Sequence, residues 1–334
     1  MIPRFLYYAM LGEDFSQLAV LESDRVAMPK INRESLGNIR VQVPGRSIQR
    51  AAVGFLDRKT AAIDDLIAKK QRLIELLQEK RQALITQAVT KGLDPNVPMK
   101  DSGVEWVGKI PEHWRPLRLK DLCDAQATGV WGSDPGIDET GFPVARTADV
   151  KHGYVAFDDI PLRSLTPREQ RQATCSAGDI IVVKSSGSAT NVVSGKVAIV
   201  RPTDPPFAVS NFLLRLRPRG GSADPWFLYF LLASSLTRQR VLRMVSTTTY
   251  PNLQVSEYMT AIVPTPPFHE QERISEALRK STDGLAATTQ ALVKSTLVLH
   301  EYRQALITAA VTGKLDIPAT PEGDVDGQAQ RMGV

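Results

Sequence analysis

Two short motifs contain residue types that could perform chemistry on DNA. The first, Asp149-Val150-Lys151, has the D-x-K form of a metal-dependent nuclease, and Asp138 lies eleven residues upstream. Two carboxylates and a lysine could bind Mg²⁺ and orient a water molecule for attack. The spacing is common by chance, however, and DVKHG also has the composition of a strand that ends in a turn. A nuclease built on Asp149 and Lys151 is therefore an alternative and not the first interpretation.

The second motif is the tetrapeptide Asp204-Pro205-Pro206-Phe207, which matches the DPPF motif that adenine-amino methyltransferases use to hold the target amino group. That chemistry also needs a glycine-rich loop for S-adenosylmethionine after an early strand, and the sequence contains none. The tetrapeptide leads directly into the apolar run FAVSNF, which predicts a turn before a strand. A methyltransferase that acts on its own is therefore, like the nuclease, an alternative and not the first interpretation.

The remaining reactive residues form no recognisable site. Ser194-Gly195-Lys196 is not a P-loop, because the first glycine is misplaced and Val197 stands where a Ser or Thr is needed. The two cysteines, Cys123 and Cys175, form no C-x-x-C pair, and the four histidines are not clustered. The sequence therefore predicts no catalytic residues, no metal site and no cofactor.

Instead, polar residues gather in the loops of the segment 104–265. Ser, Thr, Asn, Arg and Lys are the side chains that contact phosphates and base edges in DNA complexes. Each one alone is an ordinary solvated loop residue, but their concentration favours a DNA-binding surface. The predicted DNA-binding residues are Arg146, Lys151, Lys184, Ser185, Ser186, Ser188, Thr190, Asn191, Thr248, Tyr250 and Asn252.

Short elements must position these loops. The pattern of short apolar runs followed by a helical stretch and a last strand predicts a compact α+β domain. The expected strands are 143–147, 178–187, 196–201, 207–218 and a last one within TAIVPTPP, and the expected helix is 226–245.

The chain also contains a long internal repeat. Residues 81–94 read RQALITQAVTKGLD and residues 303–316 read RQALITAAVTGKLD, an offset of 222 residues. The same offset matches Phe5-Leu6-Tyr7 to Phe227-Leu228-Tyr229. A unit of this length is not a solenoid repeat. It indicates a duplicated module, which typically holds a partner at two places.

Each copy contains a long helix with an apolar residue at every seventh position, which is typical of a coiled-coil seam. Lys70 alone interrupts the row, and its aliphatic stem can lie along the seam with its ammonium group in water. Pro44-Gly45 and Pro266-Pro267 precede the two helices, and Gly92 and Gly313 are suitable C-terminal stops. The predicted seam residues are Leu56, Ile63, Leu77, Leu84, Leu278, Leu285, Leu292, Leu299 and Leu306.

Composition sets only broad limits on function. The net charge of +5 is compatible with an anionic partner such as nucleic acid, although many basic proteins bind none. Two unpaired cysteines fit a reducing, cytoplasmic location. No apolar run reaches the roughly 18 residues that a membrane span needs. A leucine zipper with a basic arm is disfavoured, because Pro29 and Pro44 interrupt the segment before the first helix.

Four stretches together resemble the specificity subunit of type I restriction–modification systems. They are IPEHWRPLRLKDL, GDIIVVKSSG, VPTPPFHEQERI and the repeated RQALIT-AVTGKLD. The resemblance implies a non-catalytic DNA-reading protein in which two target-recognition domains each read half of a split DNA site. It also implies that two spacer helices pair antiparallel as a coiled coil and dock methyltransferase subunits. A translocase–nuclease subunit would join for restriction.

The resemblance divides the chain into six parts. We expect a second target-recognition domain at 104–265, flanked by spacer helices at 47–92 and 266–314, with a linker at 93–103 and a flexible tail at 315–334. Residues 1–46 would be the C-terminal remnant of a first target-recognition domain, with a strand-like NIRVQVP at 38–44. Such a chain is expected to read one half-site and either to aggregate or to form a homodimer. A helical interaction scaffold without a DNA role is the remaining alternative.

Overall fold

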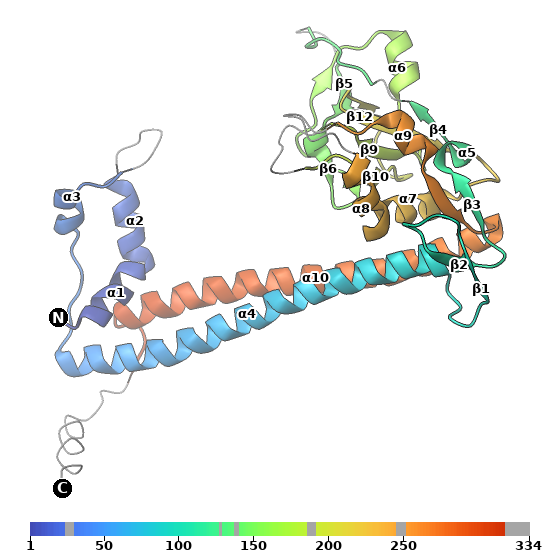
Figure 1. Cartoon of the computed structure of the whole chain (residues 1–334). Coiled ribbons are helices and arrows are strands. Elements are labelled where there is room, and N and C mark those ends of the chain that lie inside the picture. The colour runs from blue at the N-terminus through green and yellow to red at the C-terminus, as the bar shows by residue number, and fades with distance from the viewer. Residues whose placement is uncertain (24–29, 127–128, 137–139, 186–191, 245–251, 318–334) are drawn as a thin grey trace. The chain divides into compact units, whose positions relative to one another are not determined.

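The computed structural model of the chain describes residues 1–23, 30–126, 129–136, 140–185, 192–244 and 252–317. They form two compact units, one of residues 1–77 and 286–334 and the other of residues 78–285. Two long helices contribute residues to both units. They are α4 (Arg46–Lys91) and α10 (Phe268–Val311), shown in Figure 1. No helix in the described part of the chain is long and apolar enough to cross a membrane.

The second unit is built on a four-stranded antiparallel sheet with the strand order β10-β9-β12-β4. Its second strand, β9, is buried along its whole length, and successive side chains alternate between two core clusters. Ile180 and Val182 belong to one cluster, and Ile181 and Val183 to the other. Because successive strand residues point to opposite faces, both faces of the sheet are covered. The strands are β4 (Cys123–Gln126), β9 (Ile180–Val183), β10 (Val197–Ile199) and β12 (Leu213–Pro218).

Helices cover one face of this sheet and smaller strands cover the other. The first face packs against α7 (Pro225–Ala233), six of whose residues are buried. The second face packs against residues of a small three-stranded sheet of order β11-β5-β8 and of the hairpin β6-β7. These strands are β5 (Phe142–Ala145), β6 (Val150–Lys151), β7 (Tyr154–Val155), β8 (Leu162–Arg163) and β11 (Ala208–Val209). The unit thus has a mixed sheet-and-helix core, which confirms the predicted α+β class.

The remaining elements of this unit are short. Strand β13 (Ile262–Thr265) pairs antiparallel with β3 (Arg115–Arg118), and β1 (Met99–Asp101) pairs with β2 (Lys109–Pro111). The other helical segments are α5 (Leu119–Leu122), the 3-10 turn η1 (Thr147–Asp149), α6 (Pro167–Ala173), α8 (Ser235–Met244) and α9 (Val255–Thr260).

Two of the predicted elements are divided in the structure. The helix expected at 226–245 is α7 followed by α8, with a break at the fully buried Ser234. The Ser234 hydroxyl accepts from the Thr237 N–H at 3.2 Å and donates to the Leu231 carbonyl at 2.8 Å. It therefore caps the start of α8. The strand expected at 207–218 is β11 and β12, separated by a turn at 210–212.

The first unit is helical in its described residues. The helices α1 (Pro3–Leu11), α2 (Glu13–Leu21) and α3 (Arg33–Asn38) accompany the beginning of α4 and the end of α10. Its core cluster joins Phe5 and Tyr8 of α1 to Leu56 of α4 and Ile307 of α10. Because residues near the start of α4 meet residues near the end of α10, the two helices run antiparallel, as predicted.

The strand-like segment at 38–44 does not form a strand, and this expectation was wrong. Its counterpart in the repeat is the segment that contains β13, and β13 is a strand because β3 supplies its ladder hydrogen bonds. No strand is described in the first unit that could pair with residues 39–44 in this way. An extended segment without a partner remains irregular backbone.

The predicted seam residues differ in how deeply they are buried. Leu56, Ile63, Leu278 and Leu306 are buried. The other five are half-buried, namely Leu77, Leu84, Leu285, Leu292 and Leu299. The buried positions lie where a third element adds to the pair, such as α1 beside Leu56. Two helices alone leave part of each seam residue accessible to water.

Candidate nucleic-acid interface

Three predicted DNA-binding residues meet at one end of the four-stranded sheet. Lys184 and Ser185 directly follow β9, and Ser185 forms an isolated antiparallel bridge with Asn252. The Ser185 hydroxyl donates to the Asn252 side-chain oxygen, and the Leu253 N–H donates to the Lys184 carbonyl at 2.8 Å. The structure therefore brings together residues that are 67 positions apart in the sequence.

The turn between β11 and β12 is attached to the same place. The N–H groups of Lys184 and Ser185 both donate to the Phe212 carbonyl, at 2.9 and 3.3 Å. Since β9 and β12 are antiparallel neighbours, the end of β9 and the start of β12 lie at the same edge. Lys184, Ser185 and Asn252 are thus held by backbone contacts to the sheet.

Arg238 of α8 holds the backbone near this cluster, although no sequence motif identifies it. Its guanidinium donates to the Val192 carbonyl at 2.7 Å and also to the Ser194 carbonyl. Burial lowers the pKa of Arg238. The adjacent Gly195 has a φ of +79°, and a Cβ there would lie 2.3 Å from Val241 Cγ1. Only the spatial contact, which no local pattern encodes, identifies Arg238 as a support of this loop.

Arg146 has local partners in the structure. Its backbone N–H donates to Asp149 Oδ2 at 2.7 Å, and its guanidinium donates to both Asp149 oxygens at 3.1 Å. A further bond reaches the Asp159 carbonyl at 2.6 Å. The hydrogen bond with Asp149 raises the pKa of Arg146. Arg146 thus closes the η1 turn. A contact with a DNA base would have to use the guanidinium N–H groups that these bonds leave over.

The other predicted DNA-binding residues are not joined to this cluster by described contacts. Lys151 is exposed and pairs with Tyr154 across the β6-β7 hairpin. Six of the predicted residues lie outside the described part of the chain, namely Ser186, Ser188, Thr190, Asn191, Thr248 and Tyr250.

The two candidate enzyme motifs have structural roles. Asp149 is buried, and its carboxylate is bound by Arg146, while Asp138 lies outside the described residues. Within the described part of the chain, no group of three His, Cys, Asp or Glu side chains could hold a metal ion. Asp204 of the DPPF motif accepts from the Arg201 N–H at 2.8 Å. It stands in a turn that leads to the fully buried Phe207 and to β11, which confirms the turn interpretation.

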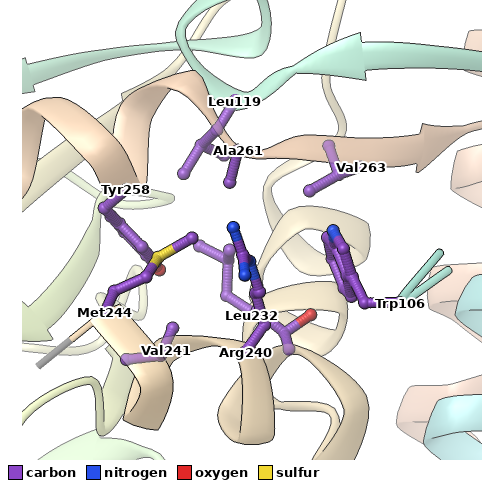
Figure 2. Close-up of a pocket in the computed structure, with 10 residues that line it drawn as sticks. Trp106, Leu119, Leu232, Arg240, Val241, Met244, Tyr258, Ala261 and Val263 are labelled. Atoms are coloured by element: carbon purple, nitrogen blue, oxygen red, sulfur yellow. The ribbon is translucent and has the colours of Figure 1, made fainter. Parts of the chain in front are cut away.

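One small cavity lies among α8, α9 and β13 of the same unit, and Figure 2 shows its lining. Most of the lining side chains are apolar, and Arg240 and Tyr258 add polar atoms that have no hydrogen-bond partner. Burial raises the pKa of Tyr258. The cavity measures about 10 Å³, the space of roughly one water molecule. It is far too small for a nucleotide or for S-adenosylmethionine.

Comparison with known proteins shows the family to which the chain belongs. A family described as "Type I restriction modification DNA specificity domain" matches residues 111–294. The specificity subunit of the type I restriction enzyme MjaVIII, from Methanocaldococcus jannaschii, is 22% identical over 94% of this chain and 70% of its own length. The EcoBI specificity subunit of Escherichia coli is 22% identical over 93% of this chain and 65% of that subunit.

A solved structure has the same fold. Its title concerns complex assembly and conformational transition of the type I R–M system. It aligns with a TM-score of 0.71 at 17% identity, over 94% of this chain and 72% of the other. The family match covers the elements from β3 to β13 and more than half of α10. As the sequence predicted, the chain is a non-catalytic component, and it belongs to the family of type I restriction–modification DNA specificity proteins.

Proposed function

We propose that this chain reads one half of a split DNA site within a type I restriction–modification complex. The observation that carries the proposal is the junction of Lys184, Ser185 and Asn252 at one end of the sheet. It combines a cation for phosphate with hydroxyl and amide groups that suit base edges. Residues 104–265 would be the recognition domain, and Lys151 and Arg146 would extend its surface.

The long helices would act as spacers and as a docking surface for methyltransferase subunits. In the first unit they expose Leu66, Leu73 and Leu76 on α4, and Val293, Leu297, Val298 and Tyr302 on α10. Each of these side chains is more than 40% exposed. Exposed apolar side chains on both of the paired helices support a role of these helices in binding another protein. A translocase–nuclease subunit would join this assembly for restriction, in the cytoplasm, where both buried cysteines remain reduced.

Salt dependence tests the phosphate contact. If Lys184 neutralises one phosphate, Lys184→Ala weakens binding to every duplex and lowers the slope of log K against log salt by about one. Lys280→Ala, which removes an exposed lysine of α10, is the matched control and leaves the slope unchanged. Binding is measured by fluorescence anisotropy at several salt concentrations. An unchanged slope for Lys184→Ala would remove this residue from the interface.

Sequence selection tests the base contacts. Asn252→Ala is expected to cost about 1–3 kcal/mol and to relax discrimination at one position of the selected site. Arg146→Ala is compared with it, and a uniform loss on all sequences would assign Arg146 to phosphate. A binding selection from random duplexes, performed with the assembled complex, gives the preferred site for each variant. A complex that selects the same site with and without this chain contradicts the proposal.

Subunit docking is tested separately. Leu297→Asp and Val298→Asp place charge on the exposed face of α10 and are expected to weaken assembly with the methyltransferase subunits. Leu162→Asp, at an equally exposed leucine of β8, is the control. Size-exclusion chromatography of the mixed subunits measures assembly. Normal assembly of both α10 variants would place the docking surface elsewhere.

A further inference from the structure

An exposed aromatic pair lies beside the proposed DNA-binding junction. Trp131 is 57% exposed and Phe212 is 45% exposed. Their rings meet edge to face, with centroids 5.2 Å apart and planes 87° from parallel. Large aromatic side chains are mostly buried in folded proteins, so two that touch each other in water suggest a binding surface.

Backbone hydrogen bonds on both sides of Trp131 hold the loop that carries the indole ring. Val130 bridges to Ser210, and the Val130 N–H donates to the Val209 carbonyl at 2.9 Å. Two residues after Trp131, Ser133 bridges to Ser164 with bonds of 3.1 and 2.9 Å. Gly132 between them has a φ of +62°. The loop is therefore fixed on both sides of the exposed ring, which lowers the entropy cost of a contact.

Phe212 joins the pair to the junction directly. Its carbonyl accepts from the N–H groups of Lys184 and Ser185, the residues proposed to bind DNA. The two residues before it, Ser210 and Asn211, each have a buried side-chain oxygen without a hydrogen-bond partner. Ser210 is 4% exposed. These two oxygens are enclosed by the protein, so the part of this surface that a nucleobase can reach is the exposed π faces of the rings.

We propose that Trp131 and Phe212 form an aromatic edge that stacks on a base of the bound DNA at a partly unstacked step. The proposal rests on the proposed DNA-reading function and adds to it a contact with a base face. A stacking contact releases no counterion, so it adds affinity that is independent of salt. It also favours a duplex in which unstacking is already easy.

Four variants test this contact in the full chain, alone and with the methyltransferase subunits. Trp131→Ala and Phe212→Ala remove the rings, and Trp131→Phe keeps an aromatic face. Tyr7→Ala removes a ring of similar exposure on α1. The ligands are random-sequence duplex DNA and the same duplex with one mismatch. Each ring deletion is expected to weaken binding about tenfold at every salt concentration, with the slope against salt unchanged.

Two signatures separate stacking from loss of structure. Trp131→Phe retains most of the affinity, and the preference for the mismatched duplex disappears in Trp131→Ala. Tyr7→Ala binds as the unmodified chain does. Fluorescence of the unmodified chain is quenched by DNA, and the quenching is lost in Trp131→Phe, although Trp106, Trp114 and Trp226 remain.

The outcomes that overturn the inference are distinct from failure of the proposed function. If Trp131→Ala and Phe212→Ala bind DNA normally while Lys184→Ala does not, the aromatic edge is wrong and DNA reading stands. If the ring deletions impair only assembly with methyltransferase subunits, the pair is a protein contact and the inference is also wrong. If the unmodified chain binds no DNA, alone or assembled, the proposed function and this inference fail together.

Discussion

Each unit contains a joint between a short helix, α1 or α7, and the long helices. The hydrogen bonds in the interior of this joint are equivalent in the two units. In the first unit, Gln49 accepts from the Ile2 N–H at 2.8 Å and donates to the Pro44 carbonyl at 2.6 Å. In the second, Gln271 accepts from the Asp224 N–H at 2.9 Å and donates to the Pro266 carbonyl at 3.0 Å. Each partner lies 222 residues from its counterpart. The repeat thus preserves individual hydrogen bonds between residues distant in the sequence.

The outside of the joint has changed. In the first unit, Asp57 accepts from the Tyr8 hydroxyl at 2.6 Å and from Arg4 at 2.8 Å. At the equivalent positions of the second unit, the Arg279 guanidinium lies 4.7 Å from the centre of the Trp226 ring. An ion pair and a cation–π contact therefore occupy one place in the fold. We infer that the interior hydrogen bonds present in both units, and not the outer polar contact, determine how the short helix packs on the long helices.

The short helices also differ in how they are covered. Tyr7 and Met10 of α1 are 47% and 40% exposed, while Tyr229 and Leu232 of α7 are 3% and 2% exposed. The reason is that α7 packs on the four-stranded sheet, and no strand is described in the first unit. One sequence pattern therefore gives a core helix in one unit and an exposed apolar face in the other.

The largest effect should come from the shared interior. Leu56→Ala and Leu278→Ala each remove a buried leucine from equivalent positions and should lower the free energy of unfolding by about 2–5 kcal/mol through cavity formation. Hydrogen exchange should show the loss of protection in the first unit for Leu56→Ala and in the second for Leu278→Ala. Leu66→Ala, at an exposed position, is the control. Equal loss in both units from either change would mean that the units unfold as one.

The buried glutamines come next. Gln271 has a third bond, to the Ser222 carbonyl at 3.1 Å, which Gln49 lacks among the described contacts. Removing either side chain leaves buried backbone groups unpaired, at about 1–3 kcal/mol. Chemical denaturation of Gln49→Ala and Gln271→Ala should show the larger loss for Gln271→Ala. The reverse order would mean that the number of hydrogen bonds does not determine how much each glutamine stabilises its unit.

A third, smaller effect concerns self-association. The exposed face of α1 lies beside a groove of about 280 Å³ lined by α1, α2, residues 40–42 and the end of α10. We expect the chain to associate through this apolar surface at high concentration. Tyr7→Lys with Met10→Lys should return the mass measured by light scattering toward the monomer value of 36.7 kDa. Leu162→Lys should not. A monomeric unmodified chain would contradict this prediction.

The smallest expected effect is a pH dependence of stability. It distinguishes the Asp57 contact of the first unit from the Arg279–Trp226 contact of the second. The hydrogen bond from Tyr8, followed by that from Arg4, holds the pKa of Asp57 below its ordinary value of 3.8. A carboxyl with a lowered folded-state pKa stabilises the fold above its ordinary value, and this contribution is lost as the pH falls through the lowered pKa. Melting temperatures between pH 6 and about 2 should therefore converge for the unmodified chain and Asp57→Asn at the acid end. Arg279→Ala should shift the melting temperature equally at all these values, because the Trp226 ring that it contacts carries no ionisable group.

Periodicity and the repeat predicted the long helices to within three residues of their observed ends, because both signals are local or internal to the sequence. The burial of β9 was also recognisable, since IIVV is apolar throughout. The break between α7 and α8 at Ser234 was not recognisable from the sequence. A serine inside an apolar helix becomes a cap only when tertiary contacts bury it. Arg238 and the Trp131–Phe212 pair were missed because their roles depend on neighbours 40 to 80 residues away in the sequence.

The buried cysteines make the chain suitable for labelling experiments. Burial raises the pKa of both Cys123 and Cys175 to about 12, and both side chains lie in the core. At neutral pH only about one thiol in 10⁵ is then the reactive thiolate. A cysteine introduced at exposed Tyr302 or Leu162 would therefore react with maleimide dyes far faster than the native pair. Spectroscopic distances between these two labelled positions could be measured without first removing any native cysteine.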